Sequence, residues 1–319
     1  MEILRREGGA VTPSMATVAE AEAMPGGPER LDRLSSPRPA ICGVAMDRPA
    51  IMGVVNVTPD SFSDGGDCAD PAAAIAHGRA LAEAGADIID VGGESTRPGS
   101  DPVPPETEIK RVLPVVAALA ADGLAISIDS RRASVMAAAL DAGALMVNDV
   151  SALSFDAESL GLIARRGVPV VLMHSRGDPQ TMQDAPQYDC APLDVFDDLE
   201  ARIDACLAAG MARERIIVDP GIGFAKSPPG ASTPGHNIEI LQRLGLLHGL
   251  GCAVLLGVSR KSFIDRLAGV DEPKQRLPGS LAAGLAGLDR GVQILRVHDV
   301  AETAQALAVW QALTADLGG

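Results

Sequence analysis

Eight short apolar runs that alternate with helical or Ala-rich stretches constrain the fold of this chain more than any other feature. The runs are Ile51–Val57, Asp87–Val91, Ala125–Ile128, Leu145–Val147, Val168–Met173, Ile216–Val218, Ala253–Val258 and Val292–Val297. The stretches between them include Pro71–Ala84, Arg132–Ala142, Leu193–Ala209 and Ala301–Leu313. Alternation of this kind predicts βαβ units and therefore a parallel sheet.

Polar side chains follow every one of these runs. They are Asn56 with Thr58, Gly93 with Glu94, Asp129, Asn148 with Asp149, His174, Asp219, Ser259 to Lys261, and His298 with Asp299. In an open doubly wound sheet only the strands beside the switch point need such groups, whereas a closed barrel brings all eight C-terminal ends to one face. We therefore predict an α/β fold, a single-domain (β/α)8 TIM barrel, with its site on that face.

The chain divides by composition at about residue 48. Residues 1–48 are rich in Ala, Pro, Gly and charge and lack a sustained apolar period, which predicts a disordered N-terminal extension. Residues 49–319 are close in number to the roughly 250 that one (β/α)8 barrel needs, so we assign them to the barrel domain.

Composition narrows the class of function. The net charge of −15 argues against broad binding to nucleic acid or anionic membranes. Aromatic residues make up only 2%, too few for a platform on which bases stack. Neither a membrane span nor a secretory signal is visible, and the five cysteines form no CxxC pair. We expect a cytoplasmic protein that acts on small molecules.

Two long loops follow the first two runs. NVTPDSFSDGG, residues 56–66, is either a surface turn or a lid over the site, and the sequence leaves both interpretations open. GGESTRPGS, residues 92–100, carries Arg97, whose planar fork suits a phosphate or a carboxylate. A surface salt bridge is the alternative for this arginine.

Single polar residues and basic pairs close the later runs. Asp129, Asn148 and Asp219 in one ring suit a heterocycle rich in N–H donors, although an aspartate there can also cap the next helix. Arg296 and His298 are two residues apart, so in a strand they point to the same side and predict an anion site. The histidines have no transition-metal spacing, but Mg2+ with oxygen ligands fits this set.

The segments taken together resemble those of one enzyme family. NVTPDSFSDGG, GGESTRPGS, ISIDS, VNDV, VLMHS, DPGIGF, GVSRKSF and RVHDV, in this order between about Pro49 and Leu313, resemble the dihydropteroate synthases. The resemblance implies a homodimeric, Mg2+-dependent transferase of folate biosynthesis, of the kind that sulfonamides target. Such an enzyme condenses 4-aminobenzoate with the diphosphate ester of 6-hydroxymethyl-7,8-dihydropterin and releases 7,8-dihydropteroate and diphosphate.

The same resemblance implies a role for each matching residue. The diphosphate and its metal are assigned to Asn56, as the metal ligand, and to Arg97, Arg296 and His298. The pterin is assigned to Asp129, Asn148, Asp219 and Lys261, with Thr96 and Met173 nearby. The aminobenzoate subsite is assigned to Phe62, Pro98, Phe224 and Ser259. The chemical step is assigned to Asp64, which faces developing positive charge, together with Arg97 and Lys261.

The match leaves some questions open. A Pro-rich insertion at residues 227–235 resembles sulfonamide-insensitive relatives, whereas the first two loops look like those of sensitive enzymes. A pterin-binding module without synthase activity, like the methyltetrahydrofolate domains of corrinoid methyltransferases, is the main alternative. Such a module needs no diphosphate site, so Arg97, Lys261, Arg296 and His298 together favour the synthase. An inactive paralogue is a third possibility, which the intact loops disfavour.

Overall fold

The structure is a computed structural model that describes residues 1–7, 10–58, 70–95, 102–176, 188–224, 226 and 235–315. Eight parallel strands close into a barrel in the order β10-β3-β4-β5-β6-β7-β8-β9. The strands are β3 (Ala50–Asn56), β4 (Ile88–Gly92), β5 (Ile126–Asp129), β6 (Met146–Asp149), β7 (Val170–Met173), β8 (Ile216–Asp219), β9 (Ala253–Leu256) and β10 (Ile294–Val297). Each predicted apolar run overlaps one of these strands, which confirms the (β/α)8 barrel.

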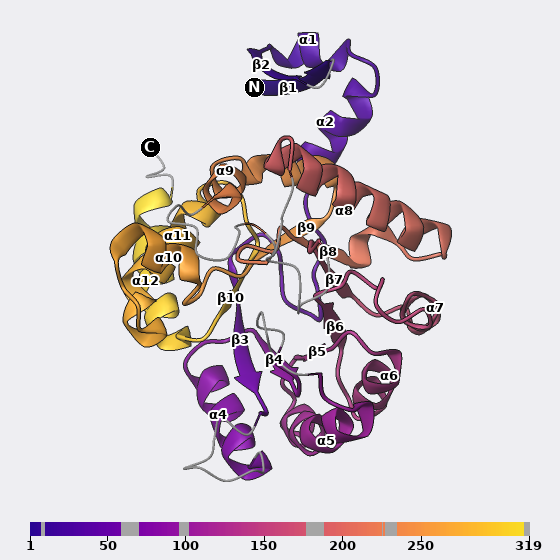
Figure 1. Cartoon of the computed structure of the whole chain (residues 1–319), viewed down its shortest axis with the longest axis vertical. Coiled ribbons are helices and arrows are strands. Elements are labelled where there is room, and N and C mark those ends of the chain that lie inside the picture. Colours follow the sequence, from indigo (N-terminus) through magenta and orange to yellow (C-terminus); the bar gives the residue numbers. More distant parts are fainter. Residues whose placement is uncertain are drawn as a thin grey trace.

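Helices surround the barrel as an outer ring (Figure 1). They are α4 (Pro71–Glu83), α5 (Pro105–Ala121), α6 (Ala133–Asp141), α7 (Ser159–Arg166), α8 (Ala191–Ala208), α9 (His236–Gln242), α10 (Ser262–Ala268), α11 (Leu277–Leu288) and α12 (Val300–Thr314). The described part of the chain also has three 3-10 helices: η1 (Arg213–Arg215) before β8, η2 (Leu244–Leu250) before β9, and η3 (Pro273–Arg276) between α10 and α11. Local sequence explains where α4 begins. Its N-cap residue is Asp70, whose carboxylate accepts the Ala72 N–H, and Pro71 occupies the first helical position. No helix in the described part of the chain is long and apolar enough to cross a membrane.

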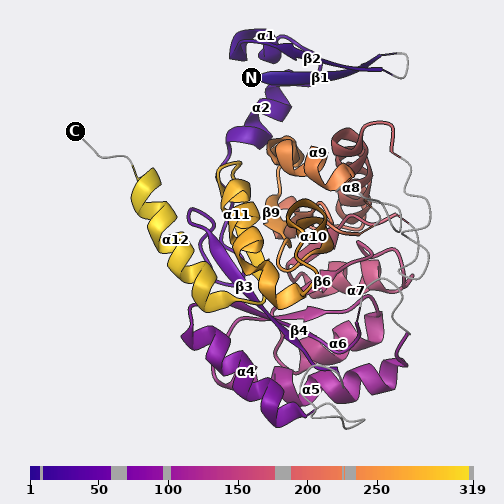
Figure 2. The ribbon, with the colours of Figure 1, turned by 60° about the vertical axis from the view of Figure 1, so that its left-hand side comes forward.

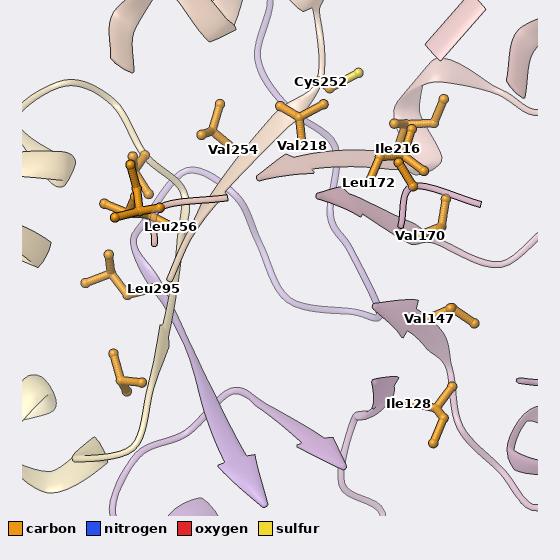
Figure 3. Close-up of a cluster of buried hydrophobic side chains, with 14 of the residues drawn as sticks. Ile128, Val147, Val170, Leu172, Ile216, Val218, Cys252, Val254, Leu256 and Leu295 are labelled. Atoms are coloured by element: carbon orange, nitrogen blue, oxygen red, sulfur yellow. The ribbon is translucent and has the colours of Figure 1, made fainter. Parts of the chain in front are cut away.

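The main hydrophobic core lies between the strands and the helices. Side chains alternate along a strand, so every second residue faces the helices. Figure 3 shows this layer, to which β7 contributes Val170 and Leu172 and β8 contributes Ile216 and Val218. All four side chains are buried, and a buried side chain of this size contributes about 1.5–3 kcal/mol to folding.

The alternate residues of the same strands point into the barrel. A second apolar cluster fills the lower part of the interior, with Met52, Ile88, Met146, Ile217 and Ile294 among its members. Two positions further along four of these strands stand polar residues: Asp90, Asn148, Asp219 and Arg296. The period of two therefore fills the N-terminal half of the barrel interior with apolar side chains and places a layer of polar side chains at the C-terminal ends of the strands.

The prediction of a disordered N-terminal extension is wrong for residues 1–35 as the structure describes them. Strands β1 (Glu2–Glu7) and β2 (Ala10–Met15) pair in antiparallel register, and helices α1 (Val18–Glu22) and α2 (Gly27–Ser35) follow. Figure 2 shows this arm outside the ring of helices, above α8 and α9. The sequence signal that could have indicated the hairpin is a Gly-Gly pair between two strand-length segments.

Specific contacts explain why the arm is ordered without a core of its own. Arg6 forms ion pairs with Asp194 and Asp197 of α8 at 2.5 and 2.8 Å. Arg38 donates through its guanidinium to four backbone carbonyls, including those of Cys252 and His248. Ile41, only 2% exposed, belongs to the cluster that fills the barrel interior. The arm is thus fastened to the barrel by charged contacts and by a buried apolar anchor.

Candidate active site

Four polar side chains form a network inside the barrel, on strands β4, β5, β6 and β10. The Arg296 guanidinium donates from Nε to Asp90 Oδ2 and from Nη2 to Asp129 Oδ2, both at 2.6 Å. Asn148 Nδ2 donates to the same Asp90 oxygen at 2.9 Å. Asp129 therefore does not serve as a helix cap; at the start of α6 the Ala133 N–H donates instead to Asp156 Oδ2 at 2.9 Å. The predicted inward direction of Arg296 is confirmed by its two carboxylate partners.

Two carboxylate oxygens of this network remain available for a ligand. Among the residues that the structure describes, the buried Oδ1 atoms of Asp90 and Asp129 have no hydrogen-bond partner. A buried acceptor without a donor costs about 1–3 kcal/mol. Desolvation raises the pKa of Asp129 to about 7, although the Arg296 charge acts in the opposite direction. The network is therefore incomplete in the way expected of a site that awaits N–H donors.

The raised pKa of Asp129 predicts a pH dependence of stability. The folded protein holds this proton more tightly than the unfolded chain, whose aspartate pKa is about 3.9. The resulting stabilisation is present in full below that value and is lost as the pH rises through about 7. We expect Asp129→Asn to remove this loss of stability, about 4 kcal/mol, from the pH 4–8 profile. Urea unfolding of both proteins across that range is the measurement, and parallel profiles would contradict the assignment.

Asp219, at the end of β8, continues the polar layer. Its Oδ1 accepts the Gly221 N–H at 2.7 Å, and burial raises its pKa. Gly221 has φ of +66°, and a Cβ added there would lie 1.9 Å from the His174 carbonyl oxygen. Glycine is thus required at this position, and the loop after β8 is pressed against the end of β7, where Met173 is buried.

The loop after β8 also brings an aromatic ring to the site. Lys261, which precedes α10, holds its Nζ 4.1 Å from the centroid of the Phe224 ring. An ammonium over an aromatic face at this distance is a cation–π contact. The positive charge of Lys261 also acts on Asp219, because it opposes the rise of that carboxyl's pKa. Lys261 is thereby brought next to Asp219 and Phe224, which belong to β8 and the loop that follows it.

His298 and Ser259 form a second polar pair at the ends of β10 and β9. The Ser259 Oγ accepts the His298 backbone N–H at 3.2 Å and lies 3.0 Å from Nδ1 of the ring. Burial, followed by the charge of Arg296, lowers the pKa of His298 to about 3, so the ring is neutral at pH 7. The serine hydroxyl hydrogen is available to Nδ1, which leaves the ring hydrogen on Nε2 as a donor. A neutral His298 can therefore still donate to an anion.

Asn56 closes β3 on the same face. It pairs with Gly92 of β4 and follows Met52 and Val54 at the inward positions of the strand. Within the described ranges no cluster of three His, Cys, Asp or Glu side chains could hold a metal. The predicted site residues Phe62, Asp64, Thr96, Arg97 and Pro98 lie outside the residues that the structure describes, as do residues 227–234 of the insertion.

Sequence reasoning missed one member of the network, Asp90. It lies inside an apolar run, IIDVGG, and is fully buried. An aspartate is almost never fully buried unless it is paired, so its place in the middle of a buried strand was a usable signal. The buried Lys226, which has no place in the predicted site, contacts His174 directly behind the loop after β8.

Comparison with known proteins identifies the family. The pterin binding enzyme family matches residues 52–298 of the chain. A dihydropteroate synthase of Neisseria meningitidis serogroup B is 47% identical over 278 residues, which cover 86% of this chain and 96% of that protein.

Solved structures agree with the sequence comparison. The structure of Xanthomonas albilineans dihydropteroate synthase with 4-aminobenzoic acid superposes with a TM-score of 0.80 at 48% identity, covering 88% of this chain and 99% of that one. The same enzyme in complex with 7,8-dihydropteroate gives a TM-score of 0.76 at 46% identity, with 85% and 96% covered. The chain therefore belongs to the dihydropteroate synthase family of pterin-binding enzymes.

Proposed function

We propose that this chain catalyses the condensation of 4-aminobenzoate with the diphosphate ester of 6-hydroxymethyl-7,8-dihydropterin. The observation that carries the proposal is the set of buried acceptors inside the barrel. Asp90 and Asp129 each keep one oxygen without a donor in the described part of the chain. Asn148 stands beside Asp129 on the next strand, β6, and Asp219 ends β8 on the same face of the barrel. A dihydropterin presents several N–H donors along one edge, which suits these acceptors.

The reaction assigns different charges to different parts of the site. The amino nitrogen of 4-aminobenzoate forms a bond to the pterin methylene carbon and loses a proton to solvent. The carbon–oxygen bond breaks, and diphosphate leaves with the electron pair. Positive charge develops on the methylene and negative charge on the leaving group, so fixed charges of both signs accelerate the step. The aspartates and Lys261, which lies beside Asp219 and Phe224, act on the pterin side, and Arg296 and His298 provide donors for the anion side.

Arg296 has two proposed roles, whereas the sequence suggested only contact with an anion. Two of its N–H groups already bond to Asp90 and Asp129, which joins the pterin acceptors to the anion side of the site. Its guanidinium has five N–H donors, so further donors remain for a phosphate oxygen. The proposed role of Arg296 is therefore to hold the acceptors in place and to contact the diphosphate.

Mg2+ is the proposed cofactor, and the donor set fits it. Asn56 offers an amide oxygen, and Mg2+ keeps several waters and substrate phosphate oxygens instead of a full protein cage. When bound, the metal neutralises charge on the departing diphosphate. The chain itself supplies one oxygen ligand and the nearby donors of His298 and Arg296.

We further propose a cytoplasmic homodimer. Apolar side chains on the later helices support a partner surface there. Leu267 at the end of α10 is 59% exposed, and Val309 and Leu313 on α12 are 57% and 80% exposed. Large apolar side chains in such positions favour contact with a second copy of the chain.

The test of the proposed function is release of diphosphate by the purified protein. We expect release that requires both the pterin diphosphate ester and 4-aminobenzoate, in the presence of Mg2+. In the same preparation, Arg296→Ala should weaken binding of the ester about a hundredfold and binding of the phosphate-free hydroxymethyl pterin much less. Calorimetry with the two ligands separates the effects, and equal losses would refute contact with the diphosphate.

A pterin-binding module without synthase activity is the competing outcome. It would bind both pterins, release no diphosphate, and lose the same affinity for each ligand on removal of Arg296. Folded protein that binds the ester but never releases diphosphate would therefore exclude the proposed reaction.

A further inference from the structure

A lysine lies completely buried beside the site and takes no part in the proposed chemistry. The side chain of Lys226 is 0% exposed. Its Nζ donates to the Phe224 carbonyl oxygen at 2.8 Å and lies 2.9 Å from His174 Nδ1, with the His174 carbonyl oxygen at 3.4 Å. A lysine is almost never fully buried unless its charge is paired or put to use. These three acceptors come from the two loops that follow β7 and β8.

His174 extends the contact outward. Its Nε2 lies 2.9 Å from Asp198 Oδ2 on helix α8, and the same oxygen accepts from Arg176 Nε at 2.9 Å. The hydrogen bond with His174, together with that from Arg176, lowers the pKa of Asp198 to about 2, so Asp198 is a carboxylate at pH 7 and accepts the hydrogen of Nε2. In a neutral ring Nδ1 is then the acceptor, and Lys226 Nζ donates to it. Burial lowers the pKa of His174 to about 4, which agrees with a neutral ring. The direction of each hydrogen bond in this chain is therefore fixed.

The hydrogen bonds from Asp198 through His174 and Lys226 end at the Phe224 carbonyl oxygen, and Phe224 belongs to the site. Phe224 gives its carbonyl oxygen to Lys226, and its ring lies under Lys261 Nζ. The backbone between Asp219 and Phe224 is tightly held, because the Gly223 N–H donates to Asn237 Oδ1 at 2.8 Å and the Phe224 N–H donates to Gly221 O at 3.0 Å. A change at the Phe224 carbonyl is consequently passed to the Phe224 ring.

We propose that Lys226 and His174 are a positioning pair that fixes Phe224, and with it the aminobenzoate subsite. Lys226 ties the carbonyl of Phe224 to the end of β7, and His174 holds the ammonium in place from the opposite side. This inference rests on the proposed function, because it assigns the pair to the aminobenzoate step of that reaction. Neither residue touches a reacting atom.

Steady-state kinetics test the pair at saturating pterin diphosphate. Lys226→Met keeps the length of the side chain and leaves the Phe224 carbonyl without its buried donor. We expect the KM for 4-aminobenzoate to rise about tenfold, with kcat and pterin affinity changed less than about threefold. A role in stability alone would instead lower the melting temperature and the active fraction, and would leave that KM unchanged.

Two substitutions of His174 separate its two hydrogen bonds. His174→Asn places a carboxamide oxygen near the position of Nδ1 and keeps an acceptor for Lys226, whereas His174→Gln reaches toward Asp198 and leaves Lys226 without the ring. We expect His174→Asn to keep the wild-type KM for 4-aminobenzoate within about threefold. His174→Gln should raise this KM about tenfold, as Lys226→Met does. Asp198→Asn is the matched control and should behave like the asparagine variant.

Hydrogen exchange gives a readout that does not depend on activity. In Lys226→Met and His174→Gln the amides of Gly223 and Phe224 should exchange at least tenfold faster, while amides of β8 keep their rates. Wild-type turnover tests the proposed function, and the variant ratios and exchange rates test the pair. Unchanged exchange at these amides, or a KM that rises in His174→Asn and not in His174→Gln, would overturn the inference. If Lys226→Met does not fold, the comparison of His174→Asn with His174→Gln tests the positioning pair on its own.

Discussion

Replacing Arg132 by methionine should destabilise the protein by about 3–5 kcal/mol, the cost of breaking a buried ion pair from one side. Arg132 Nη1 donates to Glu94 Oε2 and to Glu108 Oε2, both at 2.6 Å, and Nη2 donates to Glu94 Oε1 at 3.1 Å. The side chains of Arg132, Glu94 and Glu108 are 10%, 5% and 0% exposed. Without the guanidinium, Glu108 would be buried with no counter-ion among the residues that the structure describes.

The pH dependence of unfolding separates the cost of an unpaired buried charge in Arg132→Met from the cost of lost packing. Burial raises the pKa of Glu108, and removal of Arg132 should raise it further, so the variant's deficit should shrink as the pH falls and Glu108 becomes neutral. Arg166→Met is the matched control, because its ion pair with Asp141 is exposed and worth at most about 1 kcal/mol. Urea unfolding at pH 5 and pH 8 measures both. A deficit equal to that of the control, or one independent of pH, would contradict this account.

Asp219→Asn should abolish most of the pterin affinity while the fold survives. Asparagine can keep the acceptor for the Gly221 N–H, but it presents an NH2 donor where the second carboxylate oxygen stood. A donor that faces the N–H groups of the pterin should weaken binding at least a hundredfold. Since burial raises the pKa of Asp219, a neutral residue there is easier to bury, and the melting temperature should stay the same or rise.

Calorimetry with the pterin diphosphate and a thermal melt make the measurement. Asp122→Asn provides the control, because Asp122 pairs with Arg79 on the barrel exterior, where both side chains are exposed. We expect the control to keep its affinity within about twofold. An Asp219→Asn protein that binds the pterin as tightly as wild type would remove Asp219 from the site.

The barrel could be predicted because its signal is repeated along the chain. Every strand is a short apolar run between a helix and a polar residue, and eight such signals fix the topology even where one boundary shifts by two residues. The period of two then places Asp129, Asn148, Asp219 and Arg296 on the inner face. These residues lie in one polar layer in the structure because each is at an inward-facing position at the C-terminal end of its strand.

The parts that escaped prediction depend on contacts between distant segments. Nothing near Lys226 in the sequence shows that His174 will meet it, since the two residues are 52 positions apart. The N-terminal arm is ordered by Arg6 and Arg38, whose partners lie on α8 and near β9. The lack of a sustained apolar period predicted disorder for residues 1–48, because it gave no account of anchors supplied by the barrel.

The position of the arm has a practical consequence for the molecule as a component of larger assemblies. Both ends of the described chain emerge on the side from which β3 points away, as the two views of the ribbon agree (Figures 1 and 2). A fusion partner, an affinity tag or a surface tether joined at either end therefore stands behind the barrel. The site lies on the opposite side, at the strand C-termini, so a tether at the C-terminal end should leave the site open, but it begins beside Leu313, in the surface proposed to contact a second copy.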